Sequence, residues 1–535
     1  MAPSKTIKFR YGISYIVFAV MLLSVVSANA QPFIMQHNKF FAQDADRQAA
    51  HLDNTYNATV KPFVNGLNYN KEKLDSLYNH QYHTKSFQQI FWRKLKHESL
   101  LLVDSPNFKI MLDPLFYFEL GKDLKKTNET YYTNTRGVLI RGSIGQTFAF
   151  ESTFLENQAE FPDYVSAFVS TWGVAPGQGR VKSFKKSGAD YAGATGVMVY
   201  KPNKMLNFMA GSGKLFLGDG YRSLWLSDNA FSYPFFKANL NFQKLSYTAA
   251  WASMQIIQNG KFVFNPLSEP IFKKKVYTFQ YVSYRPIKRV DIGLFQAVMW
   301  KAQQTGNTKF DYNILNPLVF AHSAQYGLDS ANNVMLGANI NVKITHSINA
   351  YAQVMADNLK NNQIGWQGGI KYFDVAAIKN LYLQLEYNKV NAYSYSFPNA
   401  YQSFSHYNQS LAHPVGANFS EMVALTNYRF KDFYAALKFN YISTGLDSFP
   451  KYYAGNQVIT DYQPANVQSN TFLNKGKTQI IDFKLGYIIN RGSNLNIAVG
   501  AMLRDFNSNL KYGKLKTDYF YISIGTAITN KYYDF

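Results

Sequence analysis

Long stretches of this chain alternate between apolar and polar residues with a period of two. Between residues 494 and 504, the apolar positions 495, 497, 499, 501 and 503 are separated by polar or small ones. The segments 333–343, 381–388 and 481–489 show the same pattern. Because successive side chains of a strand point to opposite faces, each segment predicts a strand with one apolar face. Each segment has about the 9–11 residues that a tilted strand needs to cross a membrane.

The connections between these predicted strands differ in length in a regular way. Short connections such as 243–244 and 490–493 alternate along the chain with long ones such as 156–186 and 301–332. Strands of a soluble β-sandwich alternate too, but short turns at one end and long loops at the other are typical of outer-membrane barrels. We therefore predict an all-β fold, a transmembrane antiparallel outer-membrane β-barrel. It has about 18 strands, an even number as this architecture requires.

The predicted barrel covers residues 106–535, with its first strand near 109–120 and its last near 518–529. The residues before it, 31–105, form a separate N-terminal segment. Its segments 44–54 and 71–80 are polar and irregular, whereas Phe87, Ile90, Phe91 and Leu95 follow helical spacing. We expect one or more short helices there, on the periplasmic side or plugging the barrel mouth.

Residues 1–30 have the composition of a secretory signal peptide. Lys5, Lys8 and Arg10 precede an apolar run at 13–26, and Ala28-Asn29-Ala30 supplies a cleavage site. The run is shorter than the roughly 20 residues of a membrane-spanning helix. We expect cleavage before Gln31, export, and localisation in a bacterial outer membrane.

Composition narrows the possible partners. The chain has no Cys, which excludes disulfides and Cys-based sites, and we expect neither a metal nor a cofactor. Its 40 Tyr and 43 Phe coexist with a mean hydropathy of only −0.24, as expected for alternating lipid-facing and water-facing residues. The net charge of +22 favours acidic partners, namely lipopolysaccharide and surface polysaccharide. No basic run suggests nucleic acid, and no pattern identifies a gliding or secretion machinery as partner.

Aromatic residues gather in two of the long predicted loops. Loop 389–420 contains Tyr393, Tyr395, Phe397, Tyr401, Phe404 and Tyr407, and loop 443–476 contains Tyr452, Tyr453 and Tyr462. Exposed rings beside Asn, Gln and Ser suit stacking on sugars. The alternative is that the rings pack the loops together or form the interfacial girdle.

Loop 389–420 also holds His406 and His413 beside Ser403, Ser405 and Ser410. These are the residue types of a membrane-embedded hydrolase, which needs a base oriented by a third group. The loop contains no Asp or Glu, so only Asn408 remains for that role. We therefore expect no enzyme and no catalytic residue.

The most distinctive segment is 216–230. We predict that it is an extracellular loop that folds into the lumen, with Gly218-Asp219-Gly220 as a tight turn. We also expect ion pairs among Asp219, Arg222 and Asp228. This segment and the loop tyrosines supply the candidate ligand-binding residues. They are Asp219, Tyr221, Arg222, Trp225, Asp228, Tyr393, Tyr395, Tyr401, Tyr452 and Tyr453.

Residues 218–228, Gly-Asp-Gly-Tyr-Arg-Ser-Leu-Trp-Leu-Ser-Asp, resemble the RemB-type gliding-motility outer-membrane proteins of Bacteroidota. Those proteins are similar to the Wzi family of capsule-assembly barrels. Residues 107–121, 134–145 and 157–162 match as well, whereas the second half matches only as a generic barrel and at 530–535. The resemblance implies a barrel of about 18 strands with a periplasmic helical part, and involvement with surface polysaccharide, adhesion or movement. It implies no catalytic residue.

Together these patterns predict a non-enzymatic surface protein that binds or organises surface polysaccharide or capsule, with adhesion and gliding motility as further roles. An outer-membrane porin is the alternative, and an outer-membrane hydrolase is the second alternative. A barrel of this size has a lumen wide enough for a channel. The feature that separates the first two is whether residues 214–233 and the N-terminal segment fill that lumen.

Overall fold

The computed structural model describes most of the chain beyond residue 33. The described residues are 34–35, 38–52, 57–64, 87–96, 98–126, 129–185, 187–258, 271–300, 311–327, 331–447, 453–459, 474–510, 513–527 and 529–535. The predicted signal peptide, the polar segment 71–80 and Tyr452 lie outside them.

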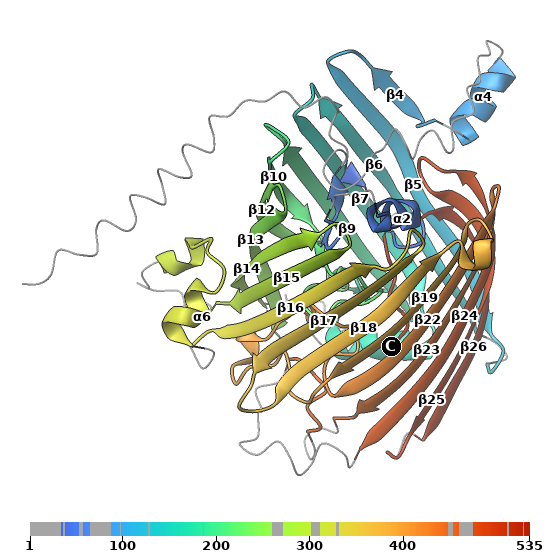
Figure 1. Cartoon of the computed structure of the whole chain (residues 1–535). Coiled ribbons are helices and arrows are strands. Elements are labelled where there is room, and N and C mark those ends of the chain that lie inside the picture. The colour runs from blue at the N-terminus through green and yellow to red at the C-terminus, as the bar shows by residue number, and fades with distance from the viewer. Residues whose placement is uncertain are drawn as a thin grey trace, which may run out of the picture.

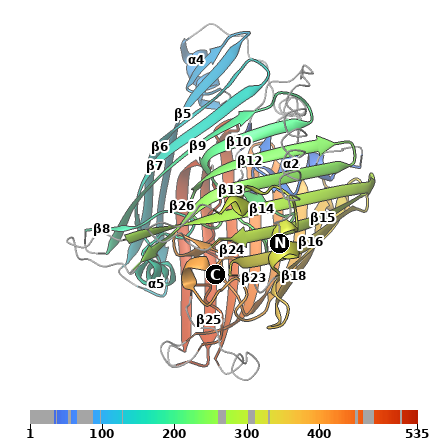
Figure 2. The same cartoon turned by 90° about the vertical axis from the view of Figure 1, so that its left-hand side faces the viewer.

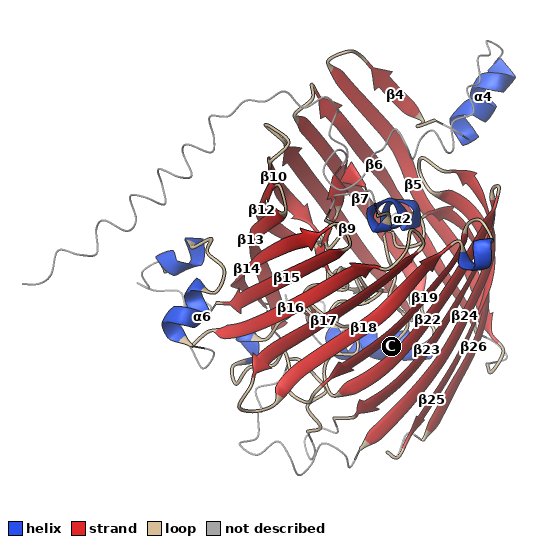
Figure 3. Cartoon of the chain, in the orientation of Figure 1, coloured by secondary structure: helices blue, strands red, loops and turns tan. Residues whose placement is uncertain are grey.

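Eighteen described strands form one closed antiparallel barrel, which confirms the predicted fold class (Figures 1 and 3). Each strand pairs with its neighbours in sequence, and the last pairs with the first, as Tyr521 with Gly121. The strands are β5 (Phe108–Asp123), β6 (Thr130–Ile144), β7 (Phe148–Glu160), β9 (Gly188–Tyr200), β10 (Leu206–Gly213), β12 (Tyr233–Phe242), β13 (Leu245–Gln258), β14 (Ile271–Ile287), β15 (Val290–Met299), β16 (Asn333–Lys343), β17 (Ile348–Asn358), β18 (Gln363–Phe373), β19 (Leu381–Val390), β22 (Phe419–Phe430), β23 (Phe433–Gly445), β24 (Lys475–Asn490), β25 (Leu495–Ser508) and β26 (Lys514–Thr526).

The period-two pattern sets which face of each strand looks outward. In β24, Ile481, Phe483 and Leu485 are exposed on the outer surface at 42%, 40% and 44%, while Asp482 and Lys484 between them are less exposed. A continuous apolar outer face is typical of a barrel whose outside contacts lipid. Among the described residues, no helix is long and apolar enough to span a membrane.

The two ends of the barrel differ as predicted. Short turns such as 243–244 and 431–432 join strands at one end, and long loops such as 214–232 and 391–418 join them at the other. In outer-membrane barrels the short-turn end is periplasmic. Short strands β4 (Leu101–Asp104) and β8 (Lys182–Phe184) extend the sheet at these two ends.

The helices lie at the two ends or inside the barrel. Figure 2 shows α4 (Phe87–Lys96), the predicted helix, beyond the start of β5, and α5 (Asp163–Trp172) near the opposite end. Helix α6 (Ala321–Tyr326) and the short helix η1 (Tyr312–Leu315) belong to a long loop. Two further short helices are η2 (Val375–Ala377) and η3 (Ala400–Gln402).

Helix α2 (Gln43–Ala50) corrects the prediction that 44–54 is irregular, and it lies within the ring of strands in Figure 1. Its buried face consists of Gln43, Ala45, Ala49 and Ala50. These residues are small or polar, so they do not form the apolar stripe by which an amphipathic helix is recognised. Asp44 and Asp46 in its first turn and Arg47 in its last suit the helix dipole.

In the described part of the chain, three segments occupy the lumen besides loop 391–418, which is bonded to one of them. One is the N-terminal lumen segment, the described residues between 34 and 64, with β1 (Ile34–Met35), β2 (Val60–Lys61), β3 (Phe63–Val64) and α2. The second is the inward loop, residues 214–232, with β11 (Phe216–Leu217), which pairs with β2. The third is the C-terminal tail, residues 529–535. It explains why β26 ends at Thr526 rather than at the predicted residue 529, since the tail turns inward.

Candidate functional site

The inward loop crosses the lumen as a packed plug. Every residue from 215 to 230 is buried, and Trp225 and Arg222 are exposed by 0% and 1%. Leu224 N donates to Gln353 on β17, and Arg222 reaches Glu421 on β22. The structure therefore confirms the prediction that this loop folds into the lumen.

A carboxylate on the barrel wall fixes the turn at the start of the loop. The backbone N–H groups of Tyr221 and Arg222 donate to Glu386 of β19 at 2.6 and 3.0 Å. A Cβ at Gly220 would overlap Glu386 Oε2, so the close approach requires glycine. Glu386 also accepts from Tyr351 Oη at 2.6 Å.

The predicted ion pairs among Asp219, Arg222 and Asp228 are wrong. Arg222 instead pairs with Glu421 at 2.9 Å and with Asp534 of the tail at 3.3 Å. The prediction paired charged residues that are close in the sequence. A loop that crosses the lumen instead contacts wall and tail residues that are distant in the sequence. The sequence analysis named neither of those carboxylates as a site residue.

Lys438 of β23 completes this buried charge cluster by pairing with Asp534 at 3.0 Å. Arg222 and Lys438 thus face Glu421 and Asp534, and Lys438 also pairs with Asp482 at 3.5 Å. Burial raises the pKa of Asp534, but Arg222 and Lys438 outweigh it, so the net pKa lies below its usual range. Removing one partner of such a buried pair costs about 3–5 kcal/mol, because it leaves the other charge uncompensated.

The two aspartates of the inward loop bind the other lumen segments. Asp219 accepts from Thr59 Oγ1 at 3.2 Å and from Asn339 at 3.3 Å. Asp228 accepts from Asn530 and from Tyr532 Oη of the tail, each at 2.6 Å. They therefore attach the loop to the N-terminal lumen segment and to the tail.

Trp225 fits a socket in the barrel wall. Its ring stacks on Phe295 of β15, with centroids 4.7 Å apart and planes at 2°, and its Nε1 donates to Val354 O at 2.9 Å. A Cβ at Gly337 of β16 would overlap the indole, so this glycine makes the space.

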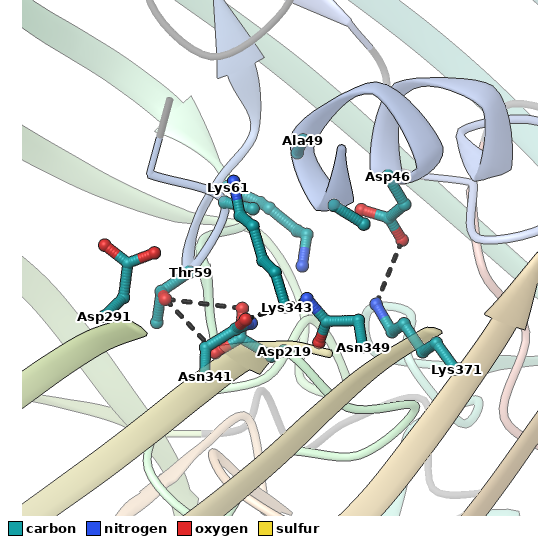
Figure 4. Close-up of a pocket in the computed structure, with 12 residues that line it drawn as sticks. Asp46, Ala49, Thr59, Lys61, Asp219, Asp291, Asn341, Lys343, Asn349 and Lys371 are labelled. Carbon is teal, nitrogen blue, oxygen red and sulfur yellow. Dashed lines mark hydrogen bonds and ion pairs between the residues drawn. The ribbon is translucent and has the colours of Figure 1, made fainter. Parts of the chain in front are cut away.

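A small charged pocket of about 20 Å³, room for a single water, lies between α2, the inward loop and the wall (Figure 4). The figure shows Thr59 bonded to Asp219 and Asp46 paired with Lys371, with Lys61 and Lys343 beside them. Among the described residues, no cluster of three or more metal-ligating side chains is present.

The second long loop, residues 391–418, packs on the inward loop. Tyr395 is buried and donates from its Oη to Leu224 O at 3.0 Å, and buried Tyr393 donates to Tyr453 O at 2.8 Å. With the five candidates in 216–230, these two tyrosines have at most 9% exposure. These seven side chains stabilise the packed lumen, and they are too buried to contact a polysaccharide outside the barrel.

Tyr401 and Tyr453 keep partial exposure. Lys273 Nζ lies 4.3 Å from the centroid of the Tyr401 ring and donates to its Oη at 2.9 Å. Of the candidate residues that the structure describes, these two are accessible at the long-loop end.

The Ser and His residues of loop 391–418 are not arranged as a nucleophile and base. His406 Nδ1 accepts from Gln255 N at 2.9 Å, and His413 Nε2 contacts Glu421 at 2.8 Å. Burial lowers the pKa of His406 to about 3 and also lowers that of His413. Asn408, which was to orient a histidine, bonds to the backbone of Ile257 instead.

No protein-family model and no curated protein sequence matches this chain. Among solved structures, it is similar to Wzi of Escherichia coli, described as an outer-membrane protein involved in group 1 capsule assembly and a carbohydrate-binding β-barrel. The TM-score is 0.52 at 11% identity, covering 92% of this chain and 99% of Wzi. The chain therefore has the fold of an outer-membrane β-barrel.

Two Pseudomonas aeruginosa structures are similar at lower scores. OprD has a TM-score of 0.40 at 11% identity, covering 81% of this chain and 97% of its own. OpdK, solved with vanillate, has 0.43 at 11%, covering 78% and 98%. These scores carry no argument about function. The RemB-type resemblance and an origin in Bacteroidota stay predictions.

Proposed function

We propose that this protein is a non-enzymatic outer-membrane protein that binds surface polysaccharide at its long-loop end, and that adhesion or gliding draws on that binding. The observation that carries the proposal is the closed lumen. The inward loop, which joins β10 to β12, is buried from 215 to 230. It reaches across to β22, nine strands around the barrel from β10, where Arg222 bonds to Glu421. A barrel filled in this way is suited to recognition at its rim more than to conduction.

The fold likeness to Wzi, whose structure is described as a carbohydrate-binding barrel, supports the same class of ligand. Export by the predicted signal peptide, capsule organisation and contact with lipopolysaccharide are parts of the proposal that rest on sequence alone.

The long-loop rim has the charge expected for an acidic polymer. Exposed lysines stand at the strand ends there, and clustered positive charge raises the local concentration of anionic ligands. They are Lys182, Lys273, Lys274, Lys475, Lys477 and Lys514. The Tyr401 ring beside Lys273 adds a partly exposed aromatic face.

Binding of the refolded mature protein to a polyuronate, compared with neutral dextran, tests this proposal. We expect the polyuronate to bind, and the Lys273→Met/Tyr401→Ala variant to bind about tenfold more weakly, which corresponds to roughly 1.4 kcal/mol. The matched control is Tyr284→Ala/Lys288→Met, the same change at exposed residues of the short-turn end. Equal binding of both polymers would contradict the proposal, as would equal losses in the two variants.

Planar-bilayer conductance separates the proposal from the porin alternative. Little or no conductance is expected from the filled barrel. Large, steady conductance of the folded wild type would make a porin the better description.

A further inference from the structure

A second space lies inside the lumen, on the short-turn side of the inward loop. It is a cavity of about 300 Å³. Residues 38–41 bound it on one side and Tyr221 of the inward loop on another, and residues 529–531 of the tail close a third. The remaining walls are strands, among them β5, β23 and β24, mostly near their short-turn halves.

The side chains that line this cavity carry a strong excess of positive charge. Six are lysines and two are aspartates, with no Glu or Arg among the lining residues that the structure describes. They are Lys39, Lys61, Lys371, Lys438, Lys484, Lys531, Asp46 and Asp482.

The two aspartates are already engaged. Asp46 pairs with Lys371 at 3.4 Å, and Asp482 pairs with Lys438 at 3.5 Å. Lys61 donates to Gly218 O at 3.0 Å. Within the described part of the chain, Lys39, Lys484 and Lys531 have no carboxylate within ion-pair distance.

These three ammonium groups face aromatic rings instead. Lys39 Nζ lies 4.5 Å from the centroid of Phe216, 4.6 Å from that of Tyr221 and 5.2 Å from that of Tyr532. Lys531 Nζ lies 3.6 Å from the Tyr117 centroid, and Lys484 Nζ 5.7 Å from that of Tyr521.

Lys39 Nζ is shielded from solvent and makes no hydrogen bond to the described residues. An ammonium group carries three donors, and burying it without an anion is costly. Hydrogen bonds between Lys39 N and Asn530, and between Asn38 and Thr529 O, hold the segments of Lys39 and Lys531 side by side.

We propose that this cavity binds a small organic anion, a carboxylate- or phosphate-bearing molecule the size of a monosaccharide, which enters from the short-turn end. Lys484 and Lys531 supply charge-assisted hydrogen bonds to the anion, and the ammonium of Lys39, buried in the cavity wall, adds positive charge. The walls at Phe40, Phe41, Leu115 and Leu437 pack against the rest of the ligand. A volume of about 300 Å³ lies at the lower end of the range for ligand pockets.

The titration of Lys39 predicts how the affinity for the anion changes with pH. Burial lowers the pKa of Lys39 to about 7, with Asp228 and Glu386 opposing this shift and Arg222 and Lys61 adding to it. An anion beside Lys39 favours its charged form. Above pH 7, Lys39 therefore takes up a proton when the anion binds. The affinity for the anion is higher at pH 6 than at pH 9.

Calorimetry on the refolded mature protein in detergent tests the proposal with glucuronate, inorganic phosphate and glucose. We expect at least one anion to bind, glucose not to bind, and the Lys484→Met/Lys531→Met variant to bind at least about tenfold more weakly. The matched control is Lys204→Met/Lys288→Met, which removes two exposed lysines of short turns outside the cavity. Which anion binds more tightly identifies the source of the charged group.

A measurement on the wild type keeps the test valid if the variant does not fold. Acetylation of lysines, followed by mass spectrometry, should slow at Lys484 and Lys531 when the anion is present, and not at Lys288. No anion binding, equal affinity in both variants, or no protection would overturn the proposal. The rim variant Lys273→Met/Tyr401→Ala should keep its affinity for the anion, so this site and the proposed polysaccharide site fail separately.

Discussion

At the scale of single residues, lumen-facing carboxylates decide how the inward loop is held. Glu386 receives two backbone N–H groups at the turn, and Glu421 receives the guanidinium of Arg222. Two glycines make the necessary room, Gly220 for the carboxylate and Gly337 for Trp225. Because these contacts are buried, each is sensitive to a change of a single group.

The Gly337→Ala substitution should lower the free energy of unfolding by about 1–3 kcal/mol, because the added methyl group overlaps the Trp225 indole. Urea unfolding of the refolded barrel in detergent measures this change. The control is Gly368→Ala, where a Cβ meets no atom within 4 Å. Equal stabilities of the two variants would show that Trp225 is not seated against β16.

Lys39 predicts a dependence of stability on pH. Its pKa is about 7 in the folded protein and 10.5 in its unperturbed state, because burial disfavours the ammonium. Between these values the unfolded chain binds more protons, so stability rises with pH from 7 to 10.5 and falls as pH decreases through that window. The slope from this residue is at most about 1.4 kcal/mol per pH unit.

The Lys39→Met variant lacks this titration. We expect its urea midpoint to depend less on pH than that of the wild type between pH 7.5 and 9.5. Parallel curves for the two proteins would contradict a buried, uncompensated Lys39.

At the scale of elements, charged side chains on the short-turn rim hold helix α2 in the lumen. Arg47 pairs with Asp374, next to the short turn after β18, and Arg429 near the end of β22 pairs with Asp44. Lys371 of β18 pairs with Asp46 at 3.4 Å. The apolar face of α2 is made only of small residues, so these ion pairs contribute much of its attachment.

The Arg47→Met/Arg429→Met variant should release α2 locally. We expect amide hydrogen exchange in residues 43–50 to be at least about tenfold faster, which corresponds to roughly 1.4 kcal/mol of local stability. Exchange in β19 should stay unchanged. Arg289→Met, at an exposed turn residue without an ion pair in the described structure, serves as control. Unchanged protection of α2 would mean that packing alone holds the helix.

At the scale of the whole molecule, the lumen is closed in two layers. The N-terminal lumen segment lies toward the short-turn end, and the inward loop with loop 391–418 fills the part behind it (Figure 1). The layers meet where Phe216 pairs with Lys61. Most bonds of the inward loop go to the wall, the tail and loop 391–418, so the second layer has its own support.

Deletion of residues 34–64 should therefore leave the barrel closed to steady ionic current, since the inward loop remains bonded to β17, β19 and β22. Planar-bilayer conductance of the folded deletion variant measures this. Folding is checked by the different electrophoretic mobility of unheated and heated barrel. A steady open channel in the deletion variant would show that the N-terminal lumen segment alone closes the lumen.

Much of the architecture followed from the chain alone. The predicted strands 381–388 and 481–489 lie in β19 and β24, and α4 covers the residues with helical spacing. Helix α2 and the end of β26 were not predicted correctly. Both lie where contacts inside the lumen, and not local periodicity, determine the backbone.

The sequence by itself determined the barrel, because a strand that separates lipid from a polar lumen must alternate with a period of two. This pattern can be read within each short segment of the sequence. Only the tertiary structure decided what fills the barrel. The partners of Arg222 are 199 and 312 residues away, and three lysines from the N-terminal segment, β24 and the tail line one cavity. Contacts between segments so distant in the chain leave no periodic trace, because they depend on which residues the closed barrel brings together.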